Sequence, residues 1–244
     1  MIGPYVNGAA LLIGSMLGGF IGPRFSRDFR LHMPMVFGCT SVGISVAMIV
    51  KVKYLAPVVL AVILGTIIGE IIHLESGIQK GVGCARKLFE KNTKAAGDVN
   101  HQEFMDKFVA LTVLFCFSGM GIYGSLHEGM TGDPTLLIIK GILDIFTSLI
   151  FASTMGYFIG ILVIPQFIVE TLLYCAAVLI VPFINSDMLG DFSACGGIIL
   201  LSIGLRLCGI KNIPVGNMIP ALVLVMPLSW IWSTYLPKPT FLAV

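Results

Sequence analysis

Long apolar segments separated by short polar connections dominate the chain. About 20 helical residues cross the hydrocarbon core of a bilayer, which is about 30 Å thick, and the apolar segments reach this length. They are too long for strands, and no alternation of apolar and polar residues persists along them. The pattern therefore predicts an all-α, polytopic transmembrane helical bundle of about eight spans. The predicted spans are residues 5–22, 33–50, 54–72, 108–126, 135–164, 166–184, 192–208 and 214–236.

Two charged residues interrupt the apolar pattern of the predicted span 135–164. Lys140 and Asp144 are four residues apart, so they share one face of a helix and can pair. The helical rise places Asp144 roughly 15 Å beyond Pro134, near the middle of the hydrocarbon layer. A charge at this depth costs about 2.5–3.5 kcal/mol even on the most lenient scale, so such residues are candidates for function.

Further polar residues extend this pattern within the membrane. Thr147 and Ser148 follow Asp144 at spacings that place them on the same face, so the helix carries one polar stripe. Glu170 supplies another carboxyl group in the next span, and burial favours the neutral form of such a group. The alternative to a functional site is that these hydroxyls and the ion pair only join helices together. Buried ion pairs do not reliably add stability.

Polar residues also lie near the ends of three other spans. Asn7 is near the start of the first span, and Glu70 is near the end of the third. Asn217 lies close to Pro220, which removes a backbone hydrogen bond, so we predict a broken helix near Asn217. Irregular backbone is tolerated in membranes where it lines a cavity, and we expect Asn217 to converge with Lys140, Asp144 and Glu170 on one cavity. Glu70 either faces a polar cavity or lies in the membrane interface. The candidate solute- or ion-binding residues are Lys140, Asp144, Thr147, Ser148, Glu170, Asn217, Glu70 and Asn7.

Glycines give the first and third spans smooth faces. Gly14, Gly18 and Gly22 recur at four-residue spacing, which lets another backbone approach closely. Both spans contain the pattern L-G-x-x-I-G, so we predict that they are related and pack alike. The same faces would allow a homo-oligomer. Separately, SVGISVAM (41–48) is similar to SIGLRLCG (202–209) in a span of opposite direction, which would fit an inverted repeat.

The composition agrees with a membrane protein. Of the 244 residues, 57% are hydrophobic and 11% are charged, whereas a soluble domain has about 25% charged residues. The net charge of +2 does not indicate an acidic partner, so we expect the lipid bilayer and no nucleic acid as partners. The first span lacks a basic segment and a cleavage site, so we predict a retained span rather than a signal peptide.

The distribution of Lys and Arg predicts the orientation. Connections one, three and seven carry most of the 15 basic residues, and this side is expected to be cytoplasmic. With eight spans, both termini then lie outside. We treat residues 1–244 as one transmembrane domain in which residues 75–107 form a cytoplasmic connection. Within it, residues 78–89 predict an amphipathic helix on the inner leaflet, and residues 91–100 predict a mobile polar segment.

Signatures of catalysis are missing from the sequence. It contains no G-x-S-x-G, H-E-x-x-H or C-x-x-C motif, and its four histidines lie in connections on both sides. Five of its six cysteines lie in predicted spans, where small apolar packing explains them better than disulfides or zinc. We therefore expect no enzyme, no catalytic residues, no cofactor and no metal site.

Four segments together resemble a known family. They are HEGMTGDPTLLIIKGILD (127–144), IGPYVNGAALLIGSMLGG (2–19), LGTIIGE (64–70) and GLRLCGIKNIPVGNMIPAL (204–222). The chain resembles the bacterial inner-membrane family that includes YqgA and YdfK, a domain family of unknown function. The resemblance implies an inner-membrane location and a role in transport, but it supplies no substrate and no functional residues.

The sequence leaves two functions open. The first is a secondary transporter or channel for a small solute or ion, which uses the polar site around Lys140, Asp144 and Glu170. The second is a structural or assembly protein of the membrane, whose polar residues only join helices together. A continuous polar cavity that touches Asp144 would favour transport, whereas a sealed Lys140–Asp144 pair would favour the structural role.

Overall fold

The computed structural model describes residues 1–81, 101–116, 118–180 and 184–235, and their regular structure is helical. Short 3₁₀ helices occur at η1 (Gly22–Arg24), η2 (Tyr157–Leu162) and η4 (Val215–Met218). The α-helices are α1 (Gly3–Ile21), α2 (Arg27–Ile49), α3 (Leu55–Ile71), α5 (His101–Cys116), α6 (Gly119–Thr131), α7 (Thr135–Met155), α8 (Val163–Ile180), α9 (Ser186–Leu207) and α10 (Pro220–Tyr235).

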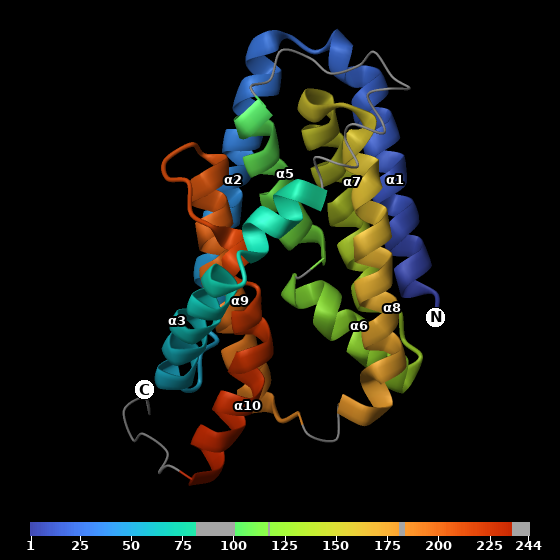
Figure 1. The fold of residues 1–244 in the computed structure, drawn as a ribbon. Helices are drawn as coiled ribbons and strands as arrows, with labels where there is room; N and C mark the ends of the chain where they lie inside the picture. Colours follow the sequence, from blue (N-terminus) through green and yellow to red (C-terminus); the bar gives the residue numbers. More distant parts are fainter. Residues whose placement is uncertain (82–100, 117, 181–183, 236–244) are drawn as a thin grey trace.

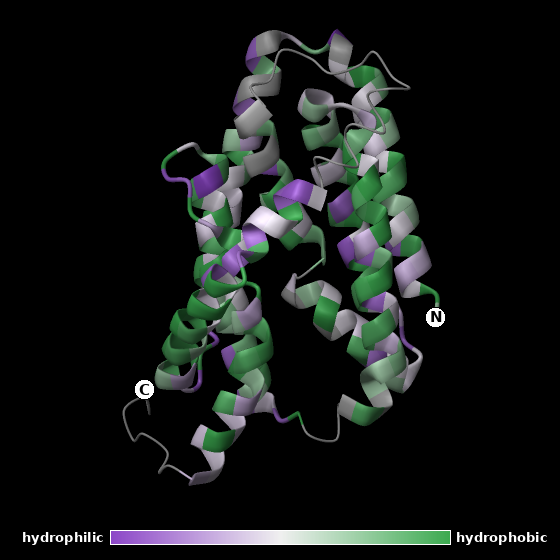
Figure 2. Ribbon diagram, viewed as in Figure 1, coloured by the Kyte–Doolittle hydropathy of each residue, from purple (hydrophilic) through white to green (hydrophobic). Residues whose placement is uncertain are grey.

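The helices are long and apolar enough for a membrane protein. Within the described ranges, 6 helices can cross a membrane, or up to 8 spans if each bent helix pair is counted as one. One bent pair joins α3 to the short helix Leu74–Gly81 at 56°, and the other, in the region of α5 and α6, is bent by 40°. The predicted polytopic bundle of about eight spans is therefore confirmed. Figure 2 shows the apolar character of most helices, with hydrophilic positions inside α7 and α8.

Helices that are distant in sequence pack in pairs (Figure 1). On one side of the molecule α1 lies along α7, and α6 lies against α8. On the other side α2 lies along α9, and α3 lies along α10. The short helix Leu74–Gly81 crosses the space between these two groups (Figure 1). The start of α1 and the end of α10 both lie in the lower half of the view (Figure 1).

The glycine face of the first span is used inside the chain. A Cβ atom on Gly14 would overlap the carbonyl oxygen of Ile145, and one on Gly18 would overlap that of Leu149. Backbone contact of α1 with α7 therefore depends on these glycines. The glycine face of α1 is therefore occupied by α7 of the same chain and is not free to bind a second copy. The homo-oligomer stays a prediction without support from this face.

The third span packs in the same manner. A Cβ atom on Gly65 would overlap the backbone of Ala221, and one on Gly69 would overlap the carbonyl oxygen of Asn217. The prediction that the two L-G-x-x-I-G segments pack alike is therefore confirmed, with α7 as the neighbour of α1 and the η4–α10 segment as the neighbour of α3.

Buried carboxylates hold the amino-terminal ends of the same two spans. Glu128 on α6 is 1% exposed and lies at the start of α1, and Asp191 on α9 is fully buried at the start of α3. Carboxylates are favoured there because helix starts present unpaired amides and a partial positive charge. The donors are the amides of Ile2 and Gly3 for Glu128, and the amides of Lys53 and Tyr54 with the hydroxyl of Ser229 for Asp191.

An exposed carboxylate, Asp133, lies just before the start of α7. Asp133 accepts hydrogen bonds from the amide and the hydroxyl of Thr135, at 3.0 and 2.5 Å. These bonds stabilise the charged carboxylate and hold the pKa of the exposed Asp133 below its ordinary value. This connection is thus a structural cap between α6 and α7.

The turn between α7 and α8 comes earlier in the chain than predicted. We expected the span 135–164 to end at Pro165, but α7 ends just before Gly156, whose φ of +77° favours glycine. The 3₁₀ helix η2 then leads into α8. Pro165 lies in the first turn of α8, where a helix needs no amide donor from it. The proline marks the start of a helix here, not the end of one.

Only part of the expected connection 75–107 is described. We predicted an amphipathic helix at residues 78–89 on the inner leaflet. The described helix Leu74–Gly81 instead packs against the protein, and Glu75 in it is buried. Residues 82–100 lie outside the described residues, and with them the rest of this helix and the predicted mobile segment.

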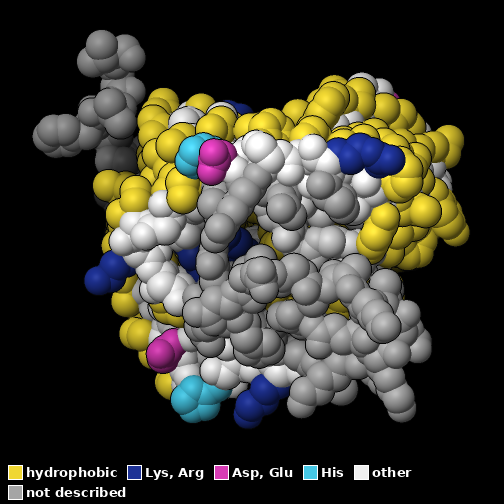
Figure 3. Space-filling model, turned by 90° about the horizontal axis from the view of Figure 1, so that it is seen from above, with side chains coloured by type: hydrophobic (Ala, Val, Ile, Leu, Met, Phe, Trp, Pro, Cys, Tyr) yellow, Lys and Arg dark blue, Asp and Glu magenta, His cyan; other side chains and the backbone are white. Residues whose placement is uncertain are grey.

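Charge and apolar surface are separated over the molecule. Figure 3 looks down on the end at which α1 passes into α2. Lys and Arg side chains occur on this end, and hydrophobic side chains cover much of the flanks.

At the level of α6, α8, α9 and α10 the structure also has a cavity of about 790 Å³. Its lining residues, which include Leu173, Phe192 and Trp230, are apolar, and none of the candidate site residues is among them.

Candidate functional site: a buried ionic network

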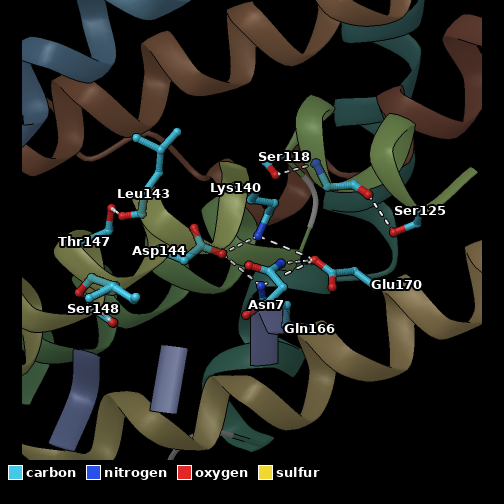
Figure 4. A network of polar contacts seen from close by, with 12 residues as sticks. Asn7, Ser118, Ser125, Lys140, Leu143, Asp144, Thr147, Ser148, Gln166 and Glu170 are labelled. Carbon is cyan, nitrogen blue, oxygen red and sulfur yellow. Dashed lines mark hydrogen bonds and ion pairs between the residues drawn. The ribbon is translucent and has the colours of Figure 1, made fainter. Parts of the chain in front are cut away.

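Five polar side chains from three helices meet inside the bundle (Figure 4). Lys140 donates a hydrogen bond to Asp144 Oδ2, and its Nζ lies 3.5 Å from Glu170 Oε1. Gln166 Nε2 bridges the two carboxylates, at 3.0 Å from Asp144 Oδ2 and 3.4 Å from Glu170 Oε1. Asn7 Nδ2 donates to the same Glu170 oxygen at 2.5 Å. We call these five residues the ionic network.

Helix geometry explains why these residues meet. Lys140 and Asp144 are one turn apart on α7, and Gln166 and Glu170 are one turn apart on α8, so each pair presents one face. Asn7 reaches the network because α1 lies so close to α7, where Gly141 faces the backbone of Asn7. Each of the three helices therefore supplies part of the site.

The start of α6 lies beside the Lys140 side chain. Ser118 caps α6 by accepting a hydrogen bond from the amide of Gly121 at 3.1 Å. A Cβ atom on Gly121 would come within 2.9 Å of Lys140 Cε, so the lysine stem lies against this glycine. The start of α6 is thus next to the network, whereas we predicted an irregular helix near Asn217.

The network is nearly closed to solvent. Lys140 is 3% exposed, Asp144 8% and Glu170 1%, while Asn7 and Gln166 are fully buried. Three of its oxygens have no hydrogen-bond partner among the described residues: Asn7 Oδ1, Gln166 Oε1 and Glu170 Oε2. Buried polar atoms are usually paired, because an unmade bond costs about 1–3 kcal/mol. Within the described part of the chain, these three oxygens therefore lack the partners that buried polar atoms usually have.

Thr147 and Ser148 do not extend the network as a polar stripe. Their hydroxyls donate to carbonyls of their own helix, Thr147 to Leu143 at 2.9 Å and Ser148 to Ile145 at 3.1 Å. Such local bonding satisfies a hydroxyl in an apolar helix without a ligand. Ser148 also lies against Gly14, so it belongs to the contact between α1 and α7.

Glu70 and Asn217 form part of a second cluster, separate from the ionic network. Asn217 Nδ2 donates to Glu70, and Asn217 Oδ1 accepts the amide of Glu75 at 2.7 Å. Glu75 in turn pairs with Arg206 at 2.8 Å and accepts the amide of Gly216 at 3.0 Å. We expected Asn217 to meet Asp144 and Glu170 at one cavity, and this prediction is wrong. The polar residues form two separate clusters, because α3 and α7 lie on different sides of the bundle.

The irregular backbone near Asn217 is a helix start rather than a break within a helix. Residues Val215–Met218 form η4, and α10 begins at Pro220, where a proline fits the first turn. Opposite η4, α3 bends into the helix Leu74–Gly81, and His73 between them has a φ of +51°. Each polar cluster therefore lies beside a bent span.

Two features of the site were not predicted from the sequence, Gln166 and the start of α6 beside Lys140. Gln166 was hidden by its position directly after Pro165, which we took as the end of a span. Its spacing of four from Glu170 was a usable signal. For the start of α6, the signal was the run Ser118-Gly119-Met120-Gly121 within an apolar segment, because serine and glycine favour helix ends.

The fold and this network together define a polytopic α-helical membrane protein with a buried ionic network between its helices. The chain belongs to the family described as "Protein of unknown function (DUF554)", whose model matches residues 2–230. It is 45% identical over 235 residues to "Uncharacterized protein YqgA" of Escherichia coli (strain K12), which covers 96% of this chain and 99% of that protein. It is 27% identical over 228 residues to "Uncharacterized membrane protein YdfK" of Bacillus subtilis (strain 168), which covers 92% and 93%. No solved structure matches the chain.

Proposed function

We propose that this protein is a secondary transporter or channel that moves a small solute or ion across the membrane through the ionic network. The observation that carries the proposal is the position of the network. Asp144 lies near the middle of the membrane-spanning helix Thr135–Met155, Lys140 lies one turn before it, and Glu170 lies within the span Tyr157–Ala177. Three oxygens of the same network have no hydrogen-bond partner among the described residues. Ionisable residues at this depth are costly and mark ion or substrate pathways in membrane proteins.

The bent spans support the same proposal. Transporters commonly build their central sites from discontinuous helices, whose free backbone groups lie inside the protein. Here one bent span places Gly121 against Lys140, and the other places Glu75 beside η4. The network is closed in this structure, so transport requires that α1, α7 or α8 move to open it to water.

We further propose that the chain lies in the bacterial inner membrane with both termini outside. Basic side chains at the end where α1 meets α2 support this orientation through the positive-inside rule (Figure 3). A tag at either terminus should then be accessible to a reagent that cannot cross the membrane.

Flux measurements in liposomes test the transport function. Purified protein is reconstituted and tested with protons, alkali cations, small anions and amino acids, and Asp144→Asn is compared with wild type. Because this variant removes the charge of Asp144 from the direct contact with Lys140, we expect at least a 10-fold loss of flux for the transported species. Asp191→Asn is the matched control, since Asp191 is buried but only caps α3. Equal flux in Asp144→Asn and wild type would remove the network from the mechanism.

The alternative is a structural or assembly role without transport. It is favoured by the nearly closed contact of Lys140 with Asp144, which is the outcome expected for a structural role, and by the glycine contacts between α1 and α7. In that case wild-type protein would move none of the tested solutes, and Asp144→Asn would lower stability without any change in flux.

A further inference from the structure

The ionic network has an unbalanced charge. With all groups ionised, Lys140 contributes one positive charge, and Asp144 and Glu170 contribute two negative charges. Uncompensated charge is strongly disfavoured in a buried site. The balance therefore requires one further positive charge at the network.

The hydrogen bonds show where this charge belongs. Glu170 Oε1 receives the Asn7 amide, the Gln166 amide and the Lys140 ammonium group, whereas Glu170 Oε2 receives no donor. Two other buried carboxylates of the described residues, Glu128 and Asp191, are supplied with several donors each. Glu170 Oε2 is thus the one carboxylate oxygen that is buried and without a partner in the described part of the chain.

Two amide side chains border the Glu170 carboxyl group. Asn7 Nδ2 and Gln166 Nε2 both contact its Oε1, whereas no donor of the described residues reaches Oε2. A proton on Glu170 Oε2 would turn this oxygen from an acceptor without a donor into a hydroxyl group. One proton would therefore balance the charge of the network.

A metal cation would fit this place less well than a proton. The Lys140 ammonium group lies 3.5 Å from Glu170 Oε1, so a metal ion bound to this carboxylate would face a positive charge at short range. The proton needs no additional space in a network that is almost fully buried.

We propose that Glu170 is a proton-binding site, and that its uptake and release of one proton is coupled to the transport described above. Glu170 takes a proton from hydronium to give a neutral carboxyl group and water, and no electrons are transferred. Asp144 stays ionised against Lys140. The coupling rests on the proposed function, but the protonation of Glu170 does not.

The surroundings of Glu170 contain few other titratable groups. Lys140 and Asp144 face it from α7, and the buried thiol of Cys116 faces it from α5. The closest polar neighbour from α1 is the uncharged Asn7, and Glu128 of α6 is engaged with the start of α1. From η2, Phe158, Ile159 and Leu162 are buried apolar residues. Glu170 is therefore the carboxyl group of this region that has a buried oxygen without a donor among the described residues.

Infrared difference spectroscopy between two pH values tests the site without any transport. The full chain is studied in lipid nanodiscs, and the signal is the C=O stretch of a protonated carboxyl group. We expect a pH-dependent band in wild type that is lost in Glu170→Gln, kept in the control Glu128→Gln and shifted in Glu170→Asp. A wild type without such a band, or a band that persists unchanged in correctly folded Glu170→Gln, would overturn the proton site.

A second measurement separates this inference from the proposed function. Proton flux is followed with a pH-sensitive dye inside liposomes, and the flux of the transported solute should depend on the proton gradient in wild type but not in Glu170→Gln. If the solute moves equally with and without a gradient, the coupling is overturned while transport stands. If no solute moves but the infrared band depends on Glu170, the proton site is supported and the transport function fails.

Discussion

Single side chains account for the ionic network and for the limits of its prediction. Lys140, Asp144 and Glu170 were recognisable because charged residues are rare in long apolar segments, and the structure joins all three. Asn7 was identified as polar, but nothing local indicated that it would bond to Glu170, 163 positions away. Gln166 was missed although it is fully buried and bridges both carboxylates.

Replacement of the lysine tests how the network is balanced. Lys140→Met leaves Asp144 as a buried charge without its cation, so we expect a loss of about 3–5 kcal/mol in the free energy of unfolding. The double variant Lys140→Met/Asp144→Asn removes both members of the pair and should recover most of this loss. Unfolding in detergent with a chemical denaturant measures both variants.

One outcome of comparing the two variants would contradict this account of the pair. If the single and the double variant are equally stable, Lys140 does not compensate Asp144, and the charge count used for the network is wrong. Their circular dichroism spectra should match that of wild type before the stabilities are compared.

Whole helices explain how the network is held in place. The α1–α7 contact is close because glycines replace side chains along it, and this closeness brings Asn7 to α7. The repeated L-G-x-x-I-G pattern predicted such packing, since small residues at four-residue spacing lie on one helix face. The ends of α7 and α8 were harder to predict, because Gly156 and Pro165 each end or start a helix according to what packs around them.

A glycine substitution tests the α1–α7 contact. Gly18→Ala places a Cβ atom against the backbone of Leu149, which cannot move aside, so we expect a loss of about 1–3 kcal/mol in stability. The control is Gly43→Ala on α2, where no atom lies within 4 Å of the new Cβ. The control should keep or raise stability by up to about 1 kcal/mol, because alanine is the better helix former. Thermal unfolding of both variants in the same detergent measures the difference, and equal melting temperatures would contradict the contact.

The molecule as a whole is a bundle in which the first and last parts of the chain pack side by side. The α1–α7, α2–α9 and α3–α10 pairs each join an early helix to a late one (Figure 1). The similar segments SVGISVAM and SIGLRLCG fall in α2 and α9, which lie along each other. An inverted repeat stays a prediction that this proximity motivates.

A disulfide cross-link tests the pairing of α2 with α9. Cys39 Sγ and Cys208 Sγ lie 3.8 Å apart, so a small movement would bring them to bonding distance, about 2.05 Å. Mild oxidation, in which the two thiols give up two protons and two electrons to the oxidant, should join them. With a protease site inserted between residues 82 and 100, the two cleaved fragments should stay together on a non-reducing gel.

Two further variants control this cross-link. Cys39→Ser and Cys208→Ser should each separate the fragments, whereas Cys175→Ser should not, since Cys175 lies on α8. Fragments that separate after oxidation of wild type would contradict the arrangement of the two helices.

Hydrophobic length and helical spacing were sufficient to predict the spans, the depth of Asp144 and the glycine faces. These properties depend on residues close in sequence, because each turn of a helix fixes which of its side chains share a face. The partners of those faces came from the folded bundle alone: Asn7 and Gln166 joined Glu170, while Asn217 and Glu70 met Arg206 and Glu75 elsewhere. Periodicity along one helix cannot specify which distant helix will lie against it, since that choice depends on how all the faces pack together.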